Sequence, residues 1–137
     1  MEDDPEGGGE APLRRQAVTS WPHRGEIWSV RIPGQPSDPH QPRPALVLSD
    51  DVRNRLADDV IVVPIFTRGA EGPTHVPLPR GAGGVKRDSV LFCEELTTLD
   101  RDFLGSGPWG AAVGSDLMAA VARAVRRAIG EVVPEPG

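Results

Sequence analysis

The chain has 137 residues, of which 38% are hydrophobic and 26% charged, and its formal net charge is −5. This length suits one domain with a single core. No apolar run approaches the roughly 20 residues that cross a bilayer, and the acidic N-terminus lacks the apolar stretch of a signal peptide. One cysteine cannot form an internal disulfide. We therefore expect a cytoplasmic protein with no membrane association.

Acidic residues are concentrated at the N-terminus. Residues 1–20 hold five acidic and two basic side chains, so the rest of the chain has a net charge near −2. A nearly balanced domain can still carry a local positive groove. We expect residues 1–20 to form a disordered acidic tail, residues 21–130 a single domain and residues 131–137 a short C-terminal tail.

The first predicted strand is EIWSVRI, in which Trp28, Val30 and Ile32 fall on one side. This alternation is typical of a half-buried strand. Residues 45–49 and 60–66 are short apolar runs rich in β-formers, which we also interpret as strands. The polar segment between them, DDVRNRLADD, has room for one helical turn.

Two further segments have strand character, residues 74–78 and residues 89–99, the second with a break near Glu94 and Glu95. The last element has a helical period instead. Its apolar side chains share one helical face. These side chains are Leu117, Val121, Ala124, Val125 and Ala128.

Ser115 is the predicted N-cap of this helix and Gly130 its stop. Several short strands followed by one helix predict a mainly β (α+β) fold, a small bent antiparallel sheet or barrel closed by the helix.

Five segments in order resemble the MazF/PemK-like toxins of type II toxin–antitoxin systems: RGEIWSV, RPALVLSDD, VIVVPIFT, PTHVPL and RDSVLFCEELTTLDRDFL. The resemblance covers roughly residues 23–130. It implies an SH3-like antiparallel barrel of five to seven strands with a C-terminal helix, and a homodimer. It also implies a sequence-selective, metal-independent endoribonuclease that uses no cofactor and is held in check by a cognate antitoxin.

RNA carries its own nucleophile, the 2′-OH. An enzyme that uses it must stabilise the additional charge on the phosphate, and a guanidinium can bind two phosphate oxygens at once. The resemblance places Arg43 on the catalytic arginine of the family, and Pro44 restricts Arg43 to an extended conformation. The alternative interpretation of Arg43 is an exposed arginine at the start of a strand.

The resemblance also points to a threonine after the strand at residues 60–66, and Thr67 is the candidate hydrogen-bond donor to the scissile phosphate. The usual slot holds Phe66 instead. Strand alternation would turn Thr67 to the opposite face, although a β-bulge could restore its direction. The alternative is an ordinary threonine at a strand end.

In relatives, the region that matches residues 89–99 contacts RNA bases. Glu95 could accept hydrogen bonds from cytosine amino groups there, or it could be part of a solvated pair with Glu94. Contacts to the RNA backbone would come from cationic side chains, with His75 as an auxiliary contact. The candidates are Arg24, Arg31, Arg68, Lys86 and Arg87.

The loop PGQPSDPHQP has proline at positions 33, 36, 39 and 42, which stiffens it toward extended geometry. It could form one wall of an RNA channel. The alternatives are a sturdy hairpin loop or a PxxP ligand for another domain.

Other chemistry-bearing residues have ordinary interpretations. The aspartate pairs are expected to form turns rather than a metal site, and the three histidines are too scattered for a two-histidine ribonuclease. Cys93 is expected to be an inert core thiol and Trp28 a core residue. Trp109 is expected to be exposed and to pack at a dimer contact.

Three functions remain open from the sequence. The first is a toxin that cleaves single-stranded mRNA or a tRNA or rRNA loop by 2′-OH attack, leaving 2′,3′-cyclic phosphate and 5′-OH ends. The second is a CcdB-like toxin of the same fold that binds DNA gyrase without cutting nucleic acid. The third is a degenerate family member that binds RNA or antitoxin without turnover.

Overall fold

A computed structural model of the chain describes residues 21–33 and 41–135. The expected acidic tail and most of the proline-rich loop lie outside these described residues. The strands are β1 (Ile27–Val30), β2 (Arg43–Val47), β3 (Asp59–Phe66), β4 (His75–Leu78), β5 (Ser89–Phe92) and β6 (Thr97–Asp100). The α-helices are α2 (Asp51–Leu56) and α3 (Ser115–Ala128), and short 3-10 helices are η1 (Ala82–Gly84), η2 (Cys93–Glu95) and η3 (Arg101–Phe103).

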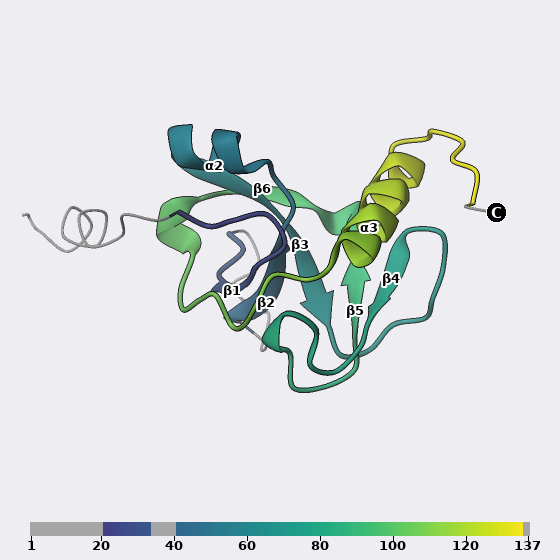
Figure 1. The fold of residues 1–137 in the computed structure, drawn as a ribbon, viewed down its shortest axis with the longest axis horizontal. Helices are drawn as coiled ribbons and strands as arrows, with labels where there is room; N and C mark the ends of the chain where they lie inside the picture. Colours follow the sequence, from purple (N-terminus) through teal and green to yellow (C-terminus); the bar gives the residue numbers. More distant parts are fainter. Residues whose placement is uncertain (1–20, 34–40, 136–137) are drawn as a thin grey trace, which may run out of the picture.

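The six strands form one antiparallel sheet in the order β1-β2-β3-β5-β4, with β6 paired to β3 outside this path (Figure 1). The predicted mainly β fold with a C-terminal helix is therefore confirmed. Within the described ranges no pairing joins β1 to β4, so the strongly bent sheet stays open.

β3 is the longest strand and holds the two parts of the sheet together. Its first part pairs with both β2 and β6, so that Val62 lies opposite Val47 on one side and Thr97 on the other. Its last two residues pair with β5 instead, with Ile65 opposite Leu91. The change of partner along one strand places the ends of β2, β3 and β5 near one another.

The sheet is buried on both faces, which explains the uninterrupted apolar runs in β2 and β3. One cluster lies under α3 and includes Ile27, Leu46 and Ile65. The cluster on the opposite face includes Val30 and Val62, with Trp28 packed against it. The predicted one-sided burial of the first strand was therefore incomplete, because Ile27 is fully buried on the face away from Trp28.

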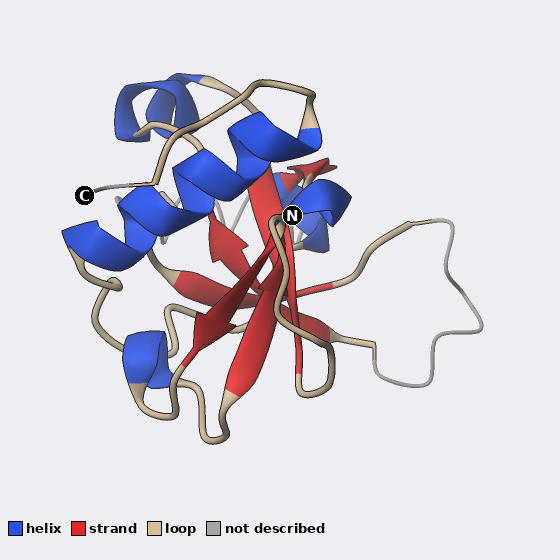
Figure 2. Cartoon of the chain, turned by 90° about the vertical axis from the view of Figure 1, so that its right-hand side faces the viewer, coloured by secondary structure: helices blue, strands red, loops and turns tan. Residues whose placement is uncertain are grey.

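Helix α3 lies across one face of the sheet (Figure 2), where it contacts η2 and β4. Its buried side chains are Met118, Val121 and Ala124, so the predicted apolar face is confirmed with Met118 added. The N-cap is Gly114, with no side-chain hydrogen bond, and Ser115 is the first helical residue. The predicted Ser115 cap was wrong by one position because pattern alone does not locate a helix end to one residue.

The chain after α3 turns at Gly130, where φ is +97°. Such a positive φ suits glycine beyond a helix end, so the predicted stop is in place. Beyond it, Glu131 accepts a hydrogen bond from Arg126 at 2.6 Å and Glu135 one from Arg127. The described part of the C-terminal tail is thus held against the last turn of α3.

Short polar segments form caps and turns as predicted. Asp50 accepts hydrogen bonds from the backbone N–H groups of Val52 and Arg53 at the start of α2, and Asp100 accepts one from Asp102 at η3. The strand predicted over residues 89–99 is interrupted by η2, close to the predicted break.

The segment at residues 105–113 runs along the outer edge of β1. Backbone hydrogen bonds join Gly105 N to Ser29 O, Trp109 N to Ile27 O and Val113 N to Gly25 O, at 2.7 to 2.9 Å. It therefore behaves as an irregular extra strand and fixes the backbone of Trp109. Among the described residues, no helix combines the length and the apolar composition needed to cross a membrane.

Candidate functional site

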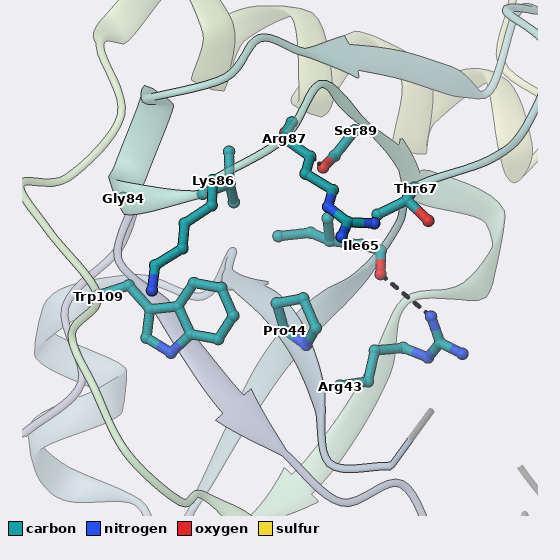
Figure 3. Close-up of a pocket in the computed structure, with 10 residues that line it drawn as sticks. Arg43, Pro44, Ile65, Thr67, Gly84, Lys86, Arg87, Ser89 and Trp109 are labelled. Atoms are coloured by element: carbon teal, nitrogen blue, oxygen red, sulfur yellow. Dashed lines mark hydrogen bonds between the residues drawn. The ribbon is translucent and has the colours of Figure 1, made fainter. Parts of the chain in front are cut away.

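An open cleft of about 600 Å³ lies where β3 ends and β2 and β5 begin (Figure 3). Three of its lining side chains are cationic, and none of the lining residues carries a carboxylate. The lining residues are Arg43, Pro44, Ile65, Thr67, Gly84, Val85, Lys86, Arg87, Ser89 and Trp109. The cleft is thus a local positive site on a chain with net negative charge.

Arg43 is the first residue of β2 and lies opposite Val30 of β1. Two of the contacts of its side chain bear on the site. Nη1 donates to the carbonyl oxygen of Ile65 at 3.2 Å, and the guanidinium carbon lies 4.0 Å from the centroid of the Phe66 ring. With only 8% of its surface exposed, Arg43 is a fixed, partly desolvated cation at the cleft wall rather than a loose surface arginine.

Thr67 lines the same cleft, one residue beyond the end of β3. Strand alternation no longer applies after Phe66. Thr67 therefore reaches the cleft although Phe66 occupies the position where the family usually has the threonine. Phe66 and Thr67 therefore have different roles. Phe66 supports the guanidinium of Arg43, and Thr67 presents an exposed hydroxyl.

Planar side chains continue away from Arg43 across the sheet. The Phe66 and Phe92 rings have centroids 4.3 Å apart, and the His75 ring stacks on Phe92 at 4.0 Å with an interplanar angle of 12°. Because β4 and β5 are antiparallel, His75 and Phe92 lie directly opposite each other. A row of four planar groups in contact therefore connects Arg43 to His75.

His75 ends this row with two hydrogen bonds. Its Nε2 lies 2.9 Å from a carboxylate oxygen of Glu94, and its Nδ1 lies 2.7 Å from the carbonyl oxygen of Ala70. The Glu94 carboxylate and then the Ala70 carbonyl raise the pKa of His75. Burial acts to raise the pKa of Glu94, but hydrogen bonds, that of His75 foremost, bring the pKa below its ordinary value. No local sequence pattern predicted the pairing of His75 with Glu94.

Lys86 and Arg87 lie on the loop between η1 and β5, and both are exposed. In Figure 3 the Arg87 side chain extends toward Thr67, and that of Lys86 toward Trp109. Ser89 follows them and donates from Oγ to the carbonyl oxygen of Arg87 at 2.9 Å. Among the described residues, neither Lys86 nor Arg87 forms a salt bridge, so both charges face the cleft.

Trp109 forms the end of the cleft beside Lys86 (Figure 3). We expected this side chain to be exposed, and 38% of its surface is, but sequence reasoning did not place it in the site. An isolated aromatic in the Gly- and Pro-rich stretch GSGPWG was the available signal. Its proximity to Lys86 depends on long-range packing that no local pattern reveals.

The structure brings four predicted site residues together in the cleft: Arg43, Thr67, Lys86 and Arg87. The remaining candidates are not among its lining residues: Arg24, Arg31, Arg68, His75 and Glu95. Arg24 donates to the carbonyl oxygen of Leu48, and His75 is bound to Glu94. Arg31, Arg68 and Glu95 are exposed.

Cys93 is fully buried, and burial raises the pKa of its thiol to about 12. It is therefore a protonated core thiol, as predicted, and unsuited to nucleophilic attack. Within residues 21–33 and 41–135, His, Cys, Asp and Glu side chains do not gather into any group of three or more that could hold a metal ion.

Comparison with known proteins identifies the family of the chain. The family described as PemK-like, MazF-like toxin of type II toxin–antitoxin systems matches residues 23–129. The chain belongs to this family of toxins.

Two relatives of this MazF-like toxin are named endoribonucleases. Endoribonuclease EndoA of Bacillus subtilis is 33% identical over 84 residues, which are 59% of this chain and 72% of the relative. Endoribonuclease MazF of Staphylococcus saprophyticus is 32% identical over 84 residues, 59% and 70% of the two chains.

A solved structure shares the fold. A mycobacterial endoribonuclease in complex with its cognate antitoxin superposes with a TM-score of 0.67 at 24% identity, covering 82% of this toxin and 99% of that chain. The resemblance drawn from five sequence segments is thereby confirmed. The implied mainly β fold with a C-terminal helix is confirmed as well, although among the described residues the sheet does not close into a barrel.

Proposed function

We propose that this MazF-like toxin is a sequence-selective endoribonuclease that cleaves single-stranded RNA in the Arg43 cleft. The observation that carries the proposal is the composition of the cleft. Three cations and the Thr67 hydroxyl line it, with no carboxylate. A phosphodiester, which is anionic and rich in acceptor oxygens, fits such a surface.

In the proposed reaction the 2′-oxygen attacks the adjacent phosphorus while the bond from phosphorus to the 5′-oxygen of the next nucleotide breaks. The 2′-oxygen loses its proton and the leaving 5′-oxygen gains one. The products are a 2′,3′-cyclic phosphate and a 5′-OH end. No bond to the protein forms, so the protein contributes alignment and charge stabilisation.

Arg43 would stabilise the charge that develops on the non-bridging phosphate oxygens. Its guanidinium is already held by the Ile65 carbonyl and the Phe66 ring, so little reorganisation is needed when the phosphate arrives. The Thr67 hydroxyl would donate a hydrogen bond to the same phosphate. We assign Arg43 no role as a base, because a guanidinium offers hydrogen-bond donors and no acceptor.

Lys86 and Arg87 would bind flanking phosphates as positive charges. We propose the remaining candidates as outer contacts for a longer RNA, because they lie outside the cleft lining. These are Arg24, Arg31, Arg68, His75 and Glu95. The cations of the cleft supply the charge neutralisation that a metal ion provides in many nucleases, so we propose a metal-independent, cofactor-free reaction.

Two protein partners belong to the proposal. A cognate antitoxin would restrain the toxin, as family membership and the antitoxin complex of the mycobacterial endoribonuclease suggest. A second copy of the chain would form a homodimer. An RNA substrate implies that the toxin acts in the cytoplasm.

The test is to incubate the purified full chain with a long RNA in EDTA and to map the new 5′ ends. We expect discrete cuts that Arg43→Ala reduces by about 10²- to 10³-fold, the usual cost of removing one donor to a developing oxyanion. Arg126→Gln, which removes a cation from the α3 surface, should cut at the wild-type rate. Full activity in Arg43→Ala would overturn the site assignment.

The other two functions give different results in the same assay. Retarded but intact RNA would indicate a degenerate RNA-binding member. Neither cleavage nor binding, together with inhibition of DNA gyrase, would indicate a CcdB-like toxin.

A further inference from the structure

Trp109 presents an aromatic ring to the cleft at the end away from Arg43 (Figure 3). Partly exposed tryptophans are costly on a surface unless they contact something, because the ring carries a large apolar area. Of the labelled side chains in Figure 3, the cationic Lys86 lies next to the ring, and Pro44 is its apolar neighbour toward Arg43. An aromatic face beside phosphate-binding cations is the arrangement with which proteins hold an unpaired base.

The backbone of Trp109 is fixed, which sets the point from which the ring projects. Its N–H donates to the carbonyl oxygen of Ile27 in β1 at 2.9 Å. Gly84 packs so closely against the Trp109 backbone that a Cβ added at Gly84 would lie 2.5 Å from the Trp109 carbonyl oxygen. A Cβ added at Gly110 would likewise lie 3.1 Å from the Cα of Gly84. A rigid platform loses little conformational entropy when a base stacks on it.

The cleft has room for more than the scissile phosphate. Its volume of about 600 Å³ lies within the range of pockets that hold a drug-sized ligand. Arg43 and Thr67 lie toward one side of it and Lys86 and Trp109 toward the other, with Pro44 between Arg43 and Trp109 in Figure 3. A strand whose phosphate rests on Arg43 would therefore bring a neighbouring base to the indole.

We propose that Trp109 is a base-stacking platform that binds one unpaired base next to the scissile phosphate, with Lys86 on the phosphate of that nucleotide. This inference rests on the proposed nuclease function and adds a determinant of binding and sequence preference to it. Stacking accepts every base but binds larger ring systems more strongly. The site therefore favours a purine at that position.

The test uses the mapped cleavage site. A short RNA with that sequence, made uncleavable by a 2′-deoxy group at the nucleotide before the cut, is titrated into the full chain. Tryptophan fluorescence should be quenched in the wild type and unchanged in Trp109→Phe, whose remaining indoles are Trp21 and Trp28. Trp109→Phe should keep most of the affinity, and Trp109→Ala should bind about 5- to 150-fold more weakly.

An abasic scan identifies the stacked nucleotide. Each position of the oligonucleotide is replaced in turn by an abasic residue and its affinity is measured against wild type and Trp109→Ala. One position should weaken binding to the wild type and have no further effect on Trp109→Ala. Absence of any such coupled position would overturn the platform, because the indole would then act independently of every base.

Two controls separate a structural role from stacking. Trp109→Ala should keep its thermal midpoint within a few degrees of the wild type and its sedimentation coefficient unchanged. A shift to monomer in this variant, without a coupled base, would assign Trp109 to a dimer contact and overturn the proposal.

The two proposals fail in distinguishable ways. RNA cleavage that depends on Arg43 but is unaffected in Trp109→Ala rejects the platform and leaves the nuclease intact. A chain that neither cuts nor binds RNA rejects both.

Discussion

The Phe66 ring lies directly beneath the Arg43 guanidinium, 4.0 Å from its central carbon to the ring centroid. Residues 43 and 66 lie across from each other when the pairing of β2 with β3 is continued by two positions. Phe66 occupies the position where the family resemblance predicts a threonine. It therefore orients Arg43, the predicted catalytic arginine. This gives the unusual residue a physical role.

Replacing Phe66 by leucine should slow RNA cleavage by about 2- to 30-fold, the equivalent of one cation–π contact. The loss should appear in the rate of a single turnover rather than in RNA affinity, because the guanidinium keeps its charge but loses its fixed orientation. Phe92→Leu is the matched control, since Phe92 touches Phe66 and His75 but not Arg43. An equal loss in both variants would contradict an orienting role for Phe66.

Lys86→Gln should weaken binding of an uncleavable RNA in the same proportion for different sequences. The slope of log affinity against log salt concentration should fall by about 0.7, the value for one phosphate contact on a single strand. Filter binding at several salt concentrations measures this slope. Arg126→Gln should keep the wild-type slope. If Lys86→Gln also kept the wild-type slope, Lys86 would contact no phosphate.

The His75–Glu94 pair should give the folded protein a measurable pH dependence. Because the folded pKa of His75 is raised above its ordinary value of 6.5, its contribution to stability is complete below that pH and is lost as pH rises through the folded value. Because the folded pKa of Glu94 is lowered below 4.5, its contribution is present above that pH and lost as pH falls through the folded value.

The thermal midpoint of the wild type should therefore be highest between these two limits. In His75→Gln the thermal midpoint should lose most of its dependence on pH near both limits. A variant at the surface of α3, Arg126→Gln, should retain that dependence. Thermal unfolding followed by circular dichroism across the acidic and neutral range measures the difference. Identical pH profiles for wild type and His75→Gln would show that the hydrogen bond contributes nothing to stability.

Gly84→Ala should destabilise the protein and displace the loop that carries Trp109. At Gly84 φ is +98°, and an added Cβ would meet the Trp109 backbone at 2.5 Å. The left-handed conformation alone costs a non-glycine residue about 1–2 kcal/mol, and the contact adds to it. Gly72→Ala is the control, because nothing lies within 4 Å of its Cβ position. Denaturant unfolding compares the two, and equal stability would contradict the tight approach.

Sequence patterns located the strands because each carried a local signal. β3 was an apolar run, and the helix had a clear 3.6-residue period. Patterns did not reveal that Ile27 is buried on the opposite face from Val30. Alternation assumes one solvated face, and here α3 covers one side of the sheet while η3 and its neighbours approach the other.

The site was predicted only in part for a similar reason. Arg43 and Thr67 were found through the family resemblance, and both line the cleft. Trp109 and the His75–Glu94 pair were missed because each relationship joins segments far apart in the chain. Such contacts are set by the change of strand partner along β3 and by the segment that follows β1, neither of which has a local sequence signature.

The segment at residues 105–113 has a further effect through its hydrogen bonds to β1. An uncovered edge strand offers a row of free amides and carbonyls on which another chain can build a sheet. Here that row is occupied along β1, while β4, at the other end of the strand order, contains Pro77, which has no N–H to donate. Both ends of the β1-to-β4 strand order are thereby blunted, which disfavours pairing of another chain with these two edges.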